Sequence, residues 1–71
     1  MNAISPKKLR HSKWTAVQPI GKALHFMVVE LEHDEDGVVQ RCLLEAVVTR
    51  KTQWLAWREL NDRRVWKQGW Q

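Results

Sequence analysis

Histidine and cysteine are the side chains that most often carry acid–base and nucleophilic chemistry, and this chain has three histidines and one cysteine. His11, His25 and His33 can each titrate near neutral pH. Only His33 lies beside acidic residues. Cys42 falls on the apolar side of a predicted strand, where a buried thiol is usually inert. Because no serine–histidine–aspartate order, glycine-rich phosphate loop or paired-carboxylate motif is present either, we expect no catalytic residues and no enzyme activity.

One acidic segment has the residue types of a metal site. It consists of Glu32, His33, Asp34, Glu35 and Asp36. Carboxylate oxygens are the ligands that hard cations prefer, but the spacing here is not that of a calcium-binding loop. A solvated hairpin tip whose charges discourage pairing at a sheet edge is the simpler interpretation. We therefore expect no metal and no cofactor.

Tryptophan is strongly over-represented. The chain has five tryptophans, no tyrosine and one phenylalanine, Phe26. The tryptophans are Trp14, Trp54, Trp57, Trp66 and Trp70. A domain of this length buries only about 60% of its unfolded surface, so each buried indole contributes substantially to stability. We expect at least three of the five indoles to lie mainly in the core, and one or two to lie near a cationic rim where they can meet a partner.

The charges are segregated along the chain. The net charge is +5 over residues 1–22, −5 over 23–49 and +4 over 50–71. If the two ends of the chain fold next to each other, their basic residues form a patch beside the tryptophans, and the acidic segment points elsewhere. The chain therefore has the composition of a small basic binding protein whose partner is a nucleic acid or an acidic protein surface.

Basic residues interleaved with aromatic residues are typical of proteins that bind single-stranded nucleic acid, in which cations contact phosphates and flat rings stack on bases. The candidate nucleic-acid-binding residues are Lys7, Lys8, Arg10, Lys13, Trp14, Arg58, Arg63, Arg64, Lys67, Trp66 and Trp70. They suggest a non-catalytic module for RNA or single-stranded DNA. Two alternatives stay open. The indoles can be core residues covered by long basic side chains, or an exposed indole patch can make the protein a protein–protein interaction adaptor.

The hydrophobic pattern predicts a mostly β fold, a small antiparallel meander or Tudor-like barrel with a short C-terminal helical turn. Strands are expected at 13–17, 23–33, 38–49 and 52–58, with a bulge near Val28 and a hairpin tip at Asp36-Gly37. Asn61 and Asp62 are expected to cap the helical turn, and Trp66 and Trp70 to share one face. The alternative is an α+β fold, with the hairpin packed on a helix over residues 43–60.

The N-terminal region differs from the rest of the chain. Residues 1–12 are interpreted as a flexible basic arm, because Pro6 interrupts any helix and no periodic apolar pattern begins before Trp14. Residues 13–71 form a single small tryptophan-rich domain. A lone cysteine suits a reducing compartment, and neither a signal peptide nor a membrane-spanning run is visible, so we expect a cytoplasmic protein without membrane contact.

Several short motifs occur together at characteristic spacings. They are Lys8-Leu9, the run from Ser12 to Val17, Phe26, the run from Leu44 to Val47, Trp57-Arg58-Glu59-Leu60, Asp62, Trp66 and Gly69-Trp70. Together they resemble a family of small tryptophan-rich bacterial proteins of unknown function, over nearly the whole chain. This resemblance implies no activity, cofactor or substrate.

Overall fold

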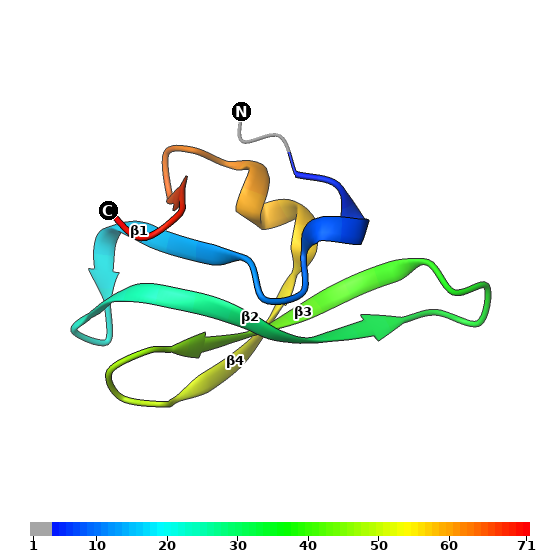
Figure 1. Cartoon of the computed structure of the whole chain (residues 1–71), viewed down its shortest axis with the longest axis horizontal. Helices are drawn as coiled ribbons and strands as arrows, with labels where there is room; N and C mark the ends of the chain where they lie inside the picture. Colours follow the sequence, from blue (N-terminus) through cyan, green and yellow to red (C-terminus); the bar gives the residue numbers. More distant parts are fainter. Residues whose placement is uncertain (1–3) are drawn as a thin grey trace.

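The computed structural model describes residues 4–71 of the chain. Five antiparallel strands form one open sheet in the order β4-β3-β2-β1-β5 (Figure 1). The strands are β1 (Lys13–Ile20), β2 (Ala23–His33), β3 (Val39–Ala46), β4 (Thr52–Ala56) and β5 (Trp66–Gln68). Two 3-10 turns, η1 (Pro6–Lys8) and η2 (Trp57–Asn61), are the helical segments of the described region. The predicted mostly β class is confirmed, whereas the closed barrel and the helix over 43–60 are not found.

One face of the sheet carries the core. Strands β1 to β4 follow one another as hairpins, and β5 returns to pair with β1. The turns η1 and η2 both lie on the same side of the sheet (Figure 1), and we call this covered face the inner face. Its largest fully buried side chains are Trp14, Leu9, Leu44, Leu60, Val28 and Cys42. The opposite, outer face is open to solvent.

The predicted bulge near Val28 is confirmed. Val28 pairs with Leu44, and the next pair is Glu30 with Leu43, so Val29 has no counterpart on β3. A bulge reverses which side chains of a strand face inward. Leu31 therefore joins the inner face on the far side of the bulge, opposite Cys42. This reversal explains why apolar residues occupy both alternating sets of β2.

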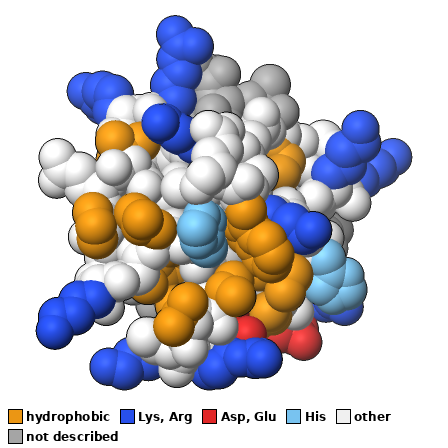
Figure 2. Space-filling view, turned by 60° about the vertical axis from the view of Figure 1, so that its left-hand side comes forward, with side chains coloured by type: hydrophobic (Ala, Val, Ile, Leu, Met, Phe, Trp, Pro, Cys, Tyr) orange, Lys and Arg blue, Asp and Glu red, His pale blue; other side chains and the backbone are white. Residues whose placement is uncertain are grey.

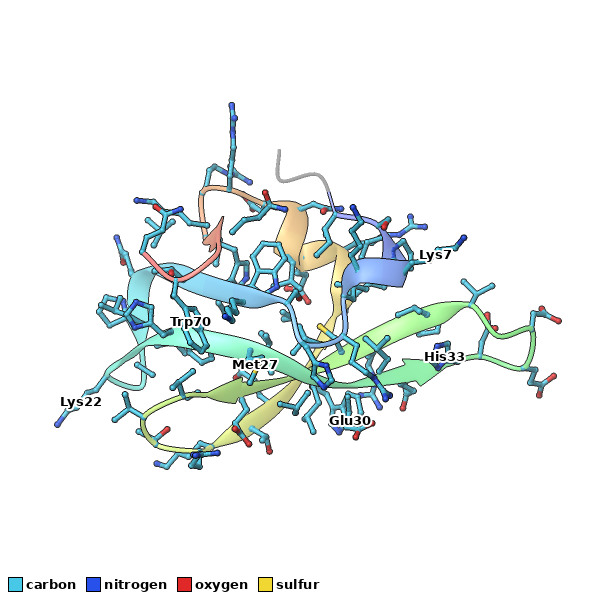
Figure 3. The ribbon with its side chains drawn as sticks, viewed as in Figure 1. Lys7, Lys22, Met27, Glu30, His33 and Trp70 are labelled. Carbon is cyan, nitrogen blue, oxygen red and sulfur yellow. The ribbon has the colours of Figure 1, made fainter. Side chains whose placement is uncertain are left out.

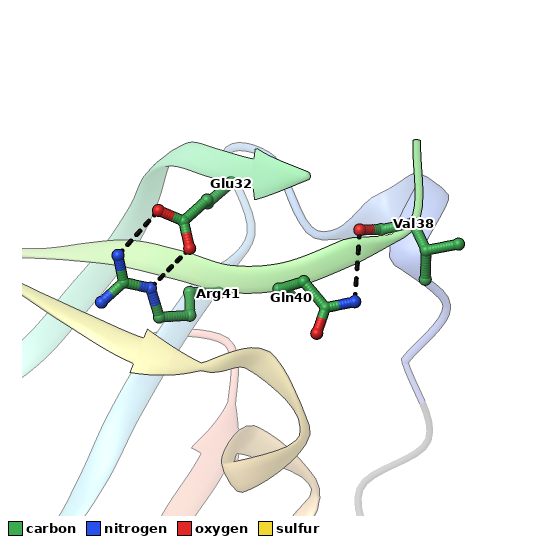
Figure 4. Close-up of polar contacts among 4 residues, drawn as sticks. All are labelled: Glu32, Val38, Gln40 and Arg41. Atoms are coloured by element: carbon green, nitrogen blue, oxygen red, sulfur yellow. Dashed lines mark hydrogen bonds and ion pairs between the residues drawn. The ribbon is translucent and has the colours of Figure 1, made fainter. Parts of the chain in front are cut away.

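The acidic segment forms the tip of the β2–β3 hairpin, as predicted. Gly37 has a φ of 80°, a conformation that glycine adopts without strain. The carboxylate of Asp34 accepts hydrogen bonds from the backbone N–H groups of Asp36 and Val38, at 2.9 Å each. Below the tip, Arg41 donates two bonds of 2.7 Å to Glu32, while the Gln40 amide reaches the Val38 carbonyl (Figure 4). Figure 3 places His33 near this tip and Trp70 toward the other end of the molecule.

Three strand ends differ from the prediction. β1 continues to Ile20 through Pro19, because its pairing with β2 is irregular between Thr15 and Ile20 and requires no N–H from proline there. β3 ends at Ala46 rather than at residue 49, since Arg50 takes up a left-handed conformation with a φ of 64° and turns the chain. Val48 therefore lies in the turn and is 84% exposed, although it falls within the predicted strand 38–49. β4 ends at Ala56 rather than at residue 58, because the 3-10 turn η2 begins at Trp57.

The start of β3 also departs from the prediction. The pairing shifts between Glu32 and His33, so that Val39 rather than Val38 faces the core. Val38 is exposed beside the hairpin tip.

The C-terminal region corrects two further expectations. The helical turn η2 lies before Asp62 and ends at Asn61, so these residues close the turn instead of opening it. Trp66 is buried on the inner face, whereas Trp70 lies on the outer face. Gly69, with a φ of 78°, reverses the chain between them. The prediction that Trp66 and Trp70 share a face is therefore wrong.

The described part of the N-terminal segment packs against the sheet. Leu9 is fully buried, and the backbone N–H of His11 donates to the Val28 carbonyl at 2.7 Å. Leu9 thus belongs to the core, although the sequence interpretation started the domain at residue 13. The flexibility of the segment stays a prediction, and residues 1–3 lie outside the described region. Within residues 4–71, no helix is long and apolar enough to cross a membrane.

Candidate functional site

Two of the candidate indoles are part of the core. Trp14 is completely buried, and its indole N–H donates to the Ser12 hydroxyl at 2.8 Å. Trp66 is also buried and meets the ring of Phe26 edge-on, with 5.4 Å between the ring centres. Neither ring has a free face, so neither can stack on a base in solution. Trp57 is half-buried against the core, and its N–H donates to the Val39 carbonyl at 3.1 Å.

Trp70 is held on the outer face of the sheet, with 44% of its surface exposed. Its indole N–H donates to the Phe26 carbonyl at 3.0 Å. The Lys13 ammonium lies 4.8 Å from the ring centre, a cation–π distance, and the His25 ring stands edge-on at 6.4 Å. The indole therefore has a fixed orientation although it faces solvent (Figure 3).

The turn that carries Trp70 is pinned by a buried hydroxyl. Thr15 donates to the Gly69 carbonyl at 2.8 Å and accepts the Gln71 N–H at 2.9 Å. A His25 ring nitrogen lies 2.9 Å from the Gln71 carbonyl. These bonds join β1, β2 and the segment after β5, so Trp70 is positioned before any partner arrives.

Aliphatic side chains extend this surface. Val17 and Val65 are each exposed by about two fifths of their surface. The Val17 N–H donates to the Val65 carbonyl at 2.8 Å, which holds these two side by side, and Val17 follows Thr15 by two residues on β1, so it shares the face of Thr15. We define the Trp70 patch as Val17, His25, Val65 and Trp70. Figure 2 shows this side of the molecule, where hydrophobic side chains lie on both sides of a histidine.

Basic residues surround the Trp70 patch. Lys13 covers Trp70, and Lys67 lies opposite Thr15 on the same face. Lys and Arg side chains project around the hydrophobic surface in Figure 2. Lys13 and Lys67 therefore form a basic border beside the apolar and aromatic residues of the Trp70 patch.

The other candidate cations do not gather at Trp70. Lys7 and Lys8 lie on η1, and Figure 3 shows Lys7 on the opposite side of the molecule from Trp70. Arg10 pairs with Glu30 at 3.3 Å. A separate shallow groove of about 480 Å³ is lined by Arg58, Asn61, Asp62, Arg63 and Arg64. The predicted nucleic-acid-binding residues thus divide into core residues, the Trp70 rim, the arginine groove and the N-terminal turn.

Comparison with known protein families gives one match. The profile of the tryptophan-rich protein family DUF2389 covers residues 12–71. The chain belongs to this family. The predicted resemblance to a tryptophan-rich family of unknown function is thereby confirmed. No curated protein and no solved structure is detectably similar to the chain. Membership in DUF2389 transfers no activity, ligand or partner to these residues.

The DUF2389 chain has one more exposed indole, which the sequence interpretation left out of the site. Trp54 lies on the outer face of β4 and is 45% exposed, with the Arg41 guanidinium 5.1 Å from its ring centre. No local signal marks this strand as an edge, because an uncharged run such as Thr52–Ala56 is typical of a strand that is paired on both sides. The aliphatic members of the Trp70 patch were missed because Val65 meets Val17 only through the return of β5 to β1, which no local pattern shows.

Burial and hydrogen bonding engage the reactive side chains of Cys42 and Asp34 in this DUF2389 protein. Burial raises the pKa of the Cys42 thiol from 9.0 to about 11, so the thiolate is scarce at neutral pH. Within residues 4–71, no three His, Cys, Asp or Glu side chains are arranged to hold a metal ion. In the acidic tip, the Asp34 carboxylate accepts hydrogen bonds from backbone N–H groups of the turn and from the Gln40 amide.

Proposed function

We propose that this protein is a non-catalytic binding module whose Trp70 patch docks onto an acidic surface of a partner protein. The observation that carries the proposal is the orientation of Trp70. Its N–H is bonded to Phe26, its turn is pinned by Thr15, and its ring still faces solvent. A rigid aromatic ring that need not be ordered on binding is typical of interface residues that dominate affinity.

The surroundings of Trp70 favour a protein over a nucleic acid. Trp14 and Trp66 are buried, which leaves Trp70 as the exposed ring of the predicted aromatic set. The other apolar members of the patch, Val17 and Val65, are aliphatic and offer neither stacking surfaces nor phosphate contacts. An apolar centre inside a charged rim is the usual arrangement of a protein interface. The basic rim speeds encounter with a partner of opposite charge.

A second candidate function rests on the arginine groove. Arg58, Arg63 and Arg64 border one depression, and arginine is well suited to phosphate. This groove supports binding of RNA or single-stranded DNA through its phosphates. This candidate is weakened because two of the three cations are already engaged, Arg64 with the Asp62 carboxylate and Arg58 with the ring of Trp57. In either case the single buried thiol fits a reducing compartment, and we place the protein in the cytoplasm.

Photo-crosslinking in the native host cells tests the proposal. A benzophenone amino acid replaces Val17 in the Trp70 patch, and a control variant carries it at exposed Gln40, near the hairpin tip. We expect a discrete crosslinked species at position 17 that protease removes and nuclease does not. Trp70→Ala in the same background should abolish it. A species that nuclease removes would support the second candidate instead, and equal crosslinking at both positions would refute the proposal.

Salt dependence separates the two candidates in vitro. Binding of single-stranded nucleic acid through about four to six phosphates should weaken with a log–log slope of roughly −3 to −4. Docking on the Trp70 patch should respond much less to salt, because most of its contact is apolar. The double variant Arg63→Glu with Arg64→Glu should abolish oligonucleotide binding, measured by fluorescence anisotropy with labelled oligo-dT and oligo-U, and should leave the Trp70 crosslink intact.

A further inference from the structure

Strand β4 is an open edge of the sheet. It ends the strand order, and no described residue outside β3 pairs with it. Thr52–Ala56 contains no charge and no proline, and its pairing with β3 is regular. Natural sheets usually protect an edge with charges, prolines or bulges, because unpaired N–H and C=O groups attract another strand. The lack of such protection indicates that this edge is used.

The backbone groups that β4 presents can be assigned from the hairpin. The Ala46 N–H donates to the Lys51 carbonyl at 2.8 Å. Bonded and non-bonded pairs alternate along an antiparallel ladder. Gln53 and Leu55 therefore bond to β3, and the N–H and C=O groups of Thr52, Trp54 and Ala56 point outward. These three residues occupy every second position along β4. An added strand can therefore form a regular ladder of hydrogen bonds with them.

Two depressions adjoin the ends of β4. One, of about 230 Å³, has a floor of Ala23, Phe26 and Ala46 and reaches Thr52 and Gln53. The other, of about 310 Å³, is lined by Val38, Val39, Gln40, Ala56, Trp57 and Arg58. Exposed Trp54 lies between these ends on the outer face. When a peptide adds to a sheet as a strand, hydrogen bonds of its main chain provide the affinity, and pockets that receive every second side chain provide the specificity.

The charges at the two ends indicate the chemistry of the added strand. Lys51 lines the first depression and Arg58 the second, whereas β4 itself has no acidic residue. A second copy of this chain fits poorly. Antiparallel pairing of two β4 strands around Trp54 would bring Lys51, just before the strand of one copy, toward Arg58, just beyond the strand of the other, and like charges close together are destabilising.

We propose that β4 binds an extended peptide as a sixth strand, with apolar or β-branched side chains at alternate positions and an acidic residue at each end. This site goes beyond the proposed function, because it lies on the edge opposite β5 and recognises backbone as well as side chains. The Trp70 patch and the β4 edge give the module two separate docking surfaces.

A synthetic probe tests the peptide site. The probe is the fluorescein-labelled heptapeptide Glu-Val-Thr-Leu-Thr-Val-Glu, measured by anisotropy and by amide NMR shifts of the whole chain. We expect the largest shifts and slowed hydrogen exchange at Thr52, Trp54 and Ala56. Shifts concentrated at the Trp70 patch, or none at a saturating peptide concentration, would overturn the peptide site.

N-methylation of the probe tests the ladder without altering the protein. One peptide carries N-methyl groups on its odd-numbered residues, and a second peptide carries them on its even-numbered residues. In a bound strand only one of these two sets of backbone N–H groups faces β4. One methylated peptide should bind about tenfold or more weakly than the unmodified probe, as expected when one to two hydrogen bonds are lost, and the other should bind nearly as well. Equal loss in both peptides contradicts strand addition.

Matched variants of the protein complete the design. Trp54→Ala removes the ring and keeps the outward N–H, whereas Trp54→Pro removes both, at an edge position where proline is tolerated. Trp54→Pro should lose clearly more affinity for the probe than Trp54→Ala. If Trp54→Pro does not fold, Thr52→Pro takes its place in the comparison. Trp70→Ala should bind the probe normally and lose only the crosslink at position 17, so the two proposals fail separately. Sedimentation that shows a dimer disrupted by Trp54→Pro would assign the edge to a second copy and reject the peptide.

Discussion

The indole N–H of Trp14 donates to the hydroxyl of Ser12 at 2.8 Å, and that hydroxyl in turn donates to the Leu9 carbonyl. A fully buried tryptophan needs a partner for its single polar atom. Ser12 supplies that partner from the segment immediately before β1. The largest ring of the core is thus tied to the chain that leads into the sheet.

Ser12→Ala should destabilise the protein by about 1 to 3 kcal/mol, because it leaves the buried indole donor without an acceptor. Urea unfolding measures this free energy. Ser5→Ala is the control, since the Ser5 side chain is exposed and makes no cap bond to η1. Ordinary surface substitutions change stability by up to about 0.5 kcal/mol. A loss of stability no larger than this in Ser12→Ala would show that the hydrogen bond of Trp14 contributes little.

Acrylamide quenching of tryptophan fluorescence should reveal two classes of indole. Trp54 and Trp70 are exposed, whereas Trp14 and Trp66 are buried. Trp70→Phe and Trp54→Phe should each lower the quenchable fraction of the emission. Trp66→Phe should leave the quenchable fraction unchanged or raise it. Five equally shielded indoles would contradict the arrangement on both faces of the sheet.

Cys42 should react slowly with thiol reagents in the folded protein. Burial raises its pKa from 9.0 to about 11, and the reagent needs the thiolate. Iodoacetamide labelling at pH 8, followed by mass spectrometry, should be much slower in buffer than in urea. The folded state binds this proton more tightly than the unfolded state, so the contribution of Cys42 to stability is complete below pH 9.0 and is lost as the pH rises toward 11. Cys42→Ala should remove this part of the pH dependence.

Gly69→Ala should destabilise the fold by about 1 to 2 kcal/mol, because a side chain at its positive φ of 78° is strained even though the space around it is empty. Gly69→Asn should cost less, since asparagine tolerates this conformation. Thermal unfolding gives the stabilities, and the indole N–H shift of Trp70 reports its bond to Phe26. An alanine variant with unchanged stability and shift would show that the turn adapts.

The ion pair between Arg64 and Asp62 should be visible as a pKa change. The guanidinium and the backbone N–H of Arg64 both bond the Asp62 carboxylate and lower its pKa. Arg64→Gln should raise that pKa toward the ordinary aspartate value, as measured by NMR titration of the carboxyl carbon. In the native chain the stabilisation is present above the ordinary aspartate pKa and is lost as the pH falls through the lowered value. An unchanged pKa in the variant would assign the shift to the backbone N–H alone.

The central hairpin was predictable because its signals are local. β-branched residues, an Asp-Gly pair and a change in the apolar alternation near Val28 each act within a few residues, and together they place β2, the tip and the bulge. The end of β3 was not predictable in this way. Val47 and Val48 continue the strand pattern, and only the left-handed backbone of Arg50 ends it, in a residue type that gives no such signal.

The candidate site depended on distant contacts. The spacing of Trp66 and Trp70 indicates a shared face in any regular element. The positive φ of Gly69 interrupts the regular element, so that the two rings lie on opposite faces of the sheet. The charges could be counted from the sequence, but their division between η1, the arginine groove and the Trp70 rim follows from the return of β5 to β1. That pairing joins residues that no local pattern connects.

The pairing of Ala16 with Trp66 also determines when the protein can fold during its synthesis. The hairpins of β1 to β4 join neighbouring segments and can close early, because short loops cost little entropy. The core lacks Trp66, and the outer face lacks Trp70, until the segment after residue 65 has been made. A nascent chain released before that point therefore lacks the edge-on partner of the Phe26 ring, and a premature stop codon before residue 66 should give an insoluble or rapidly degraded product.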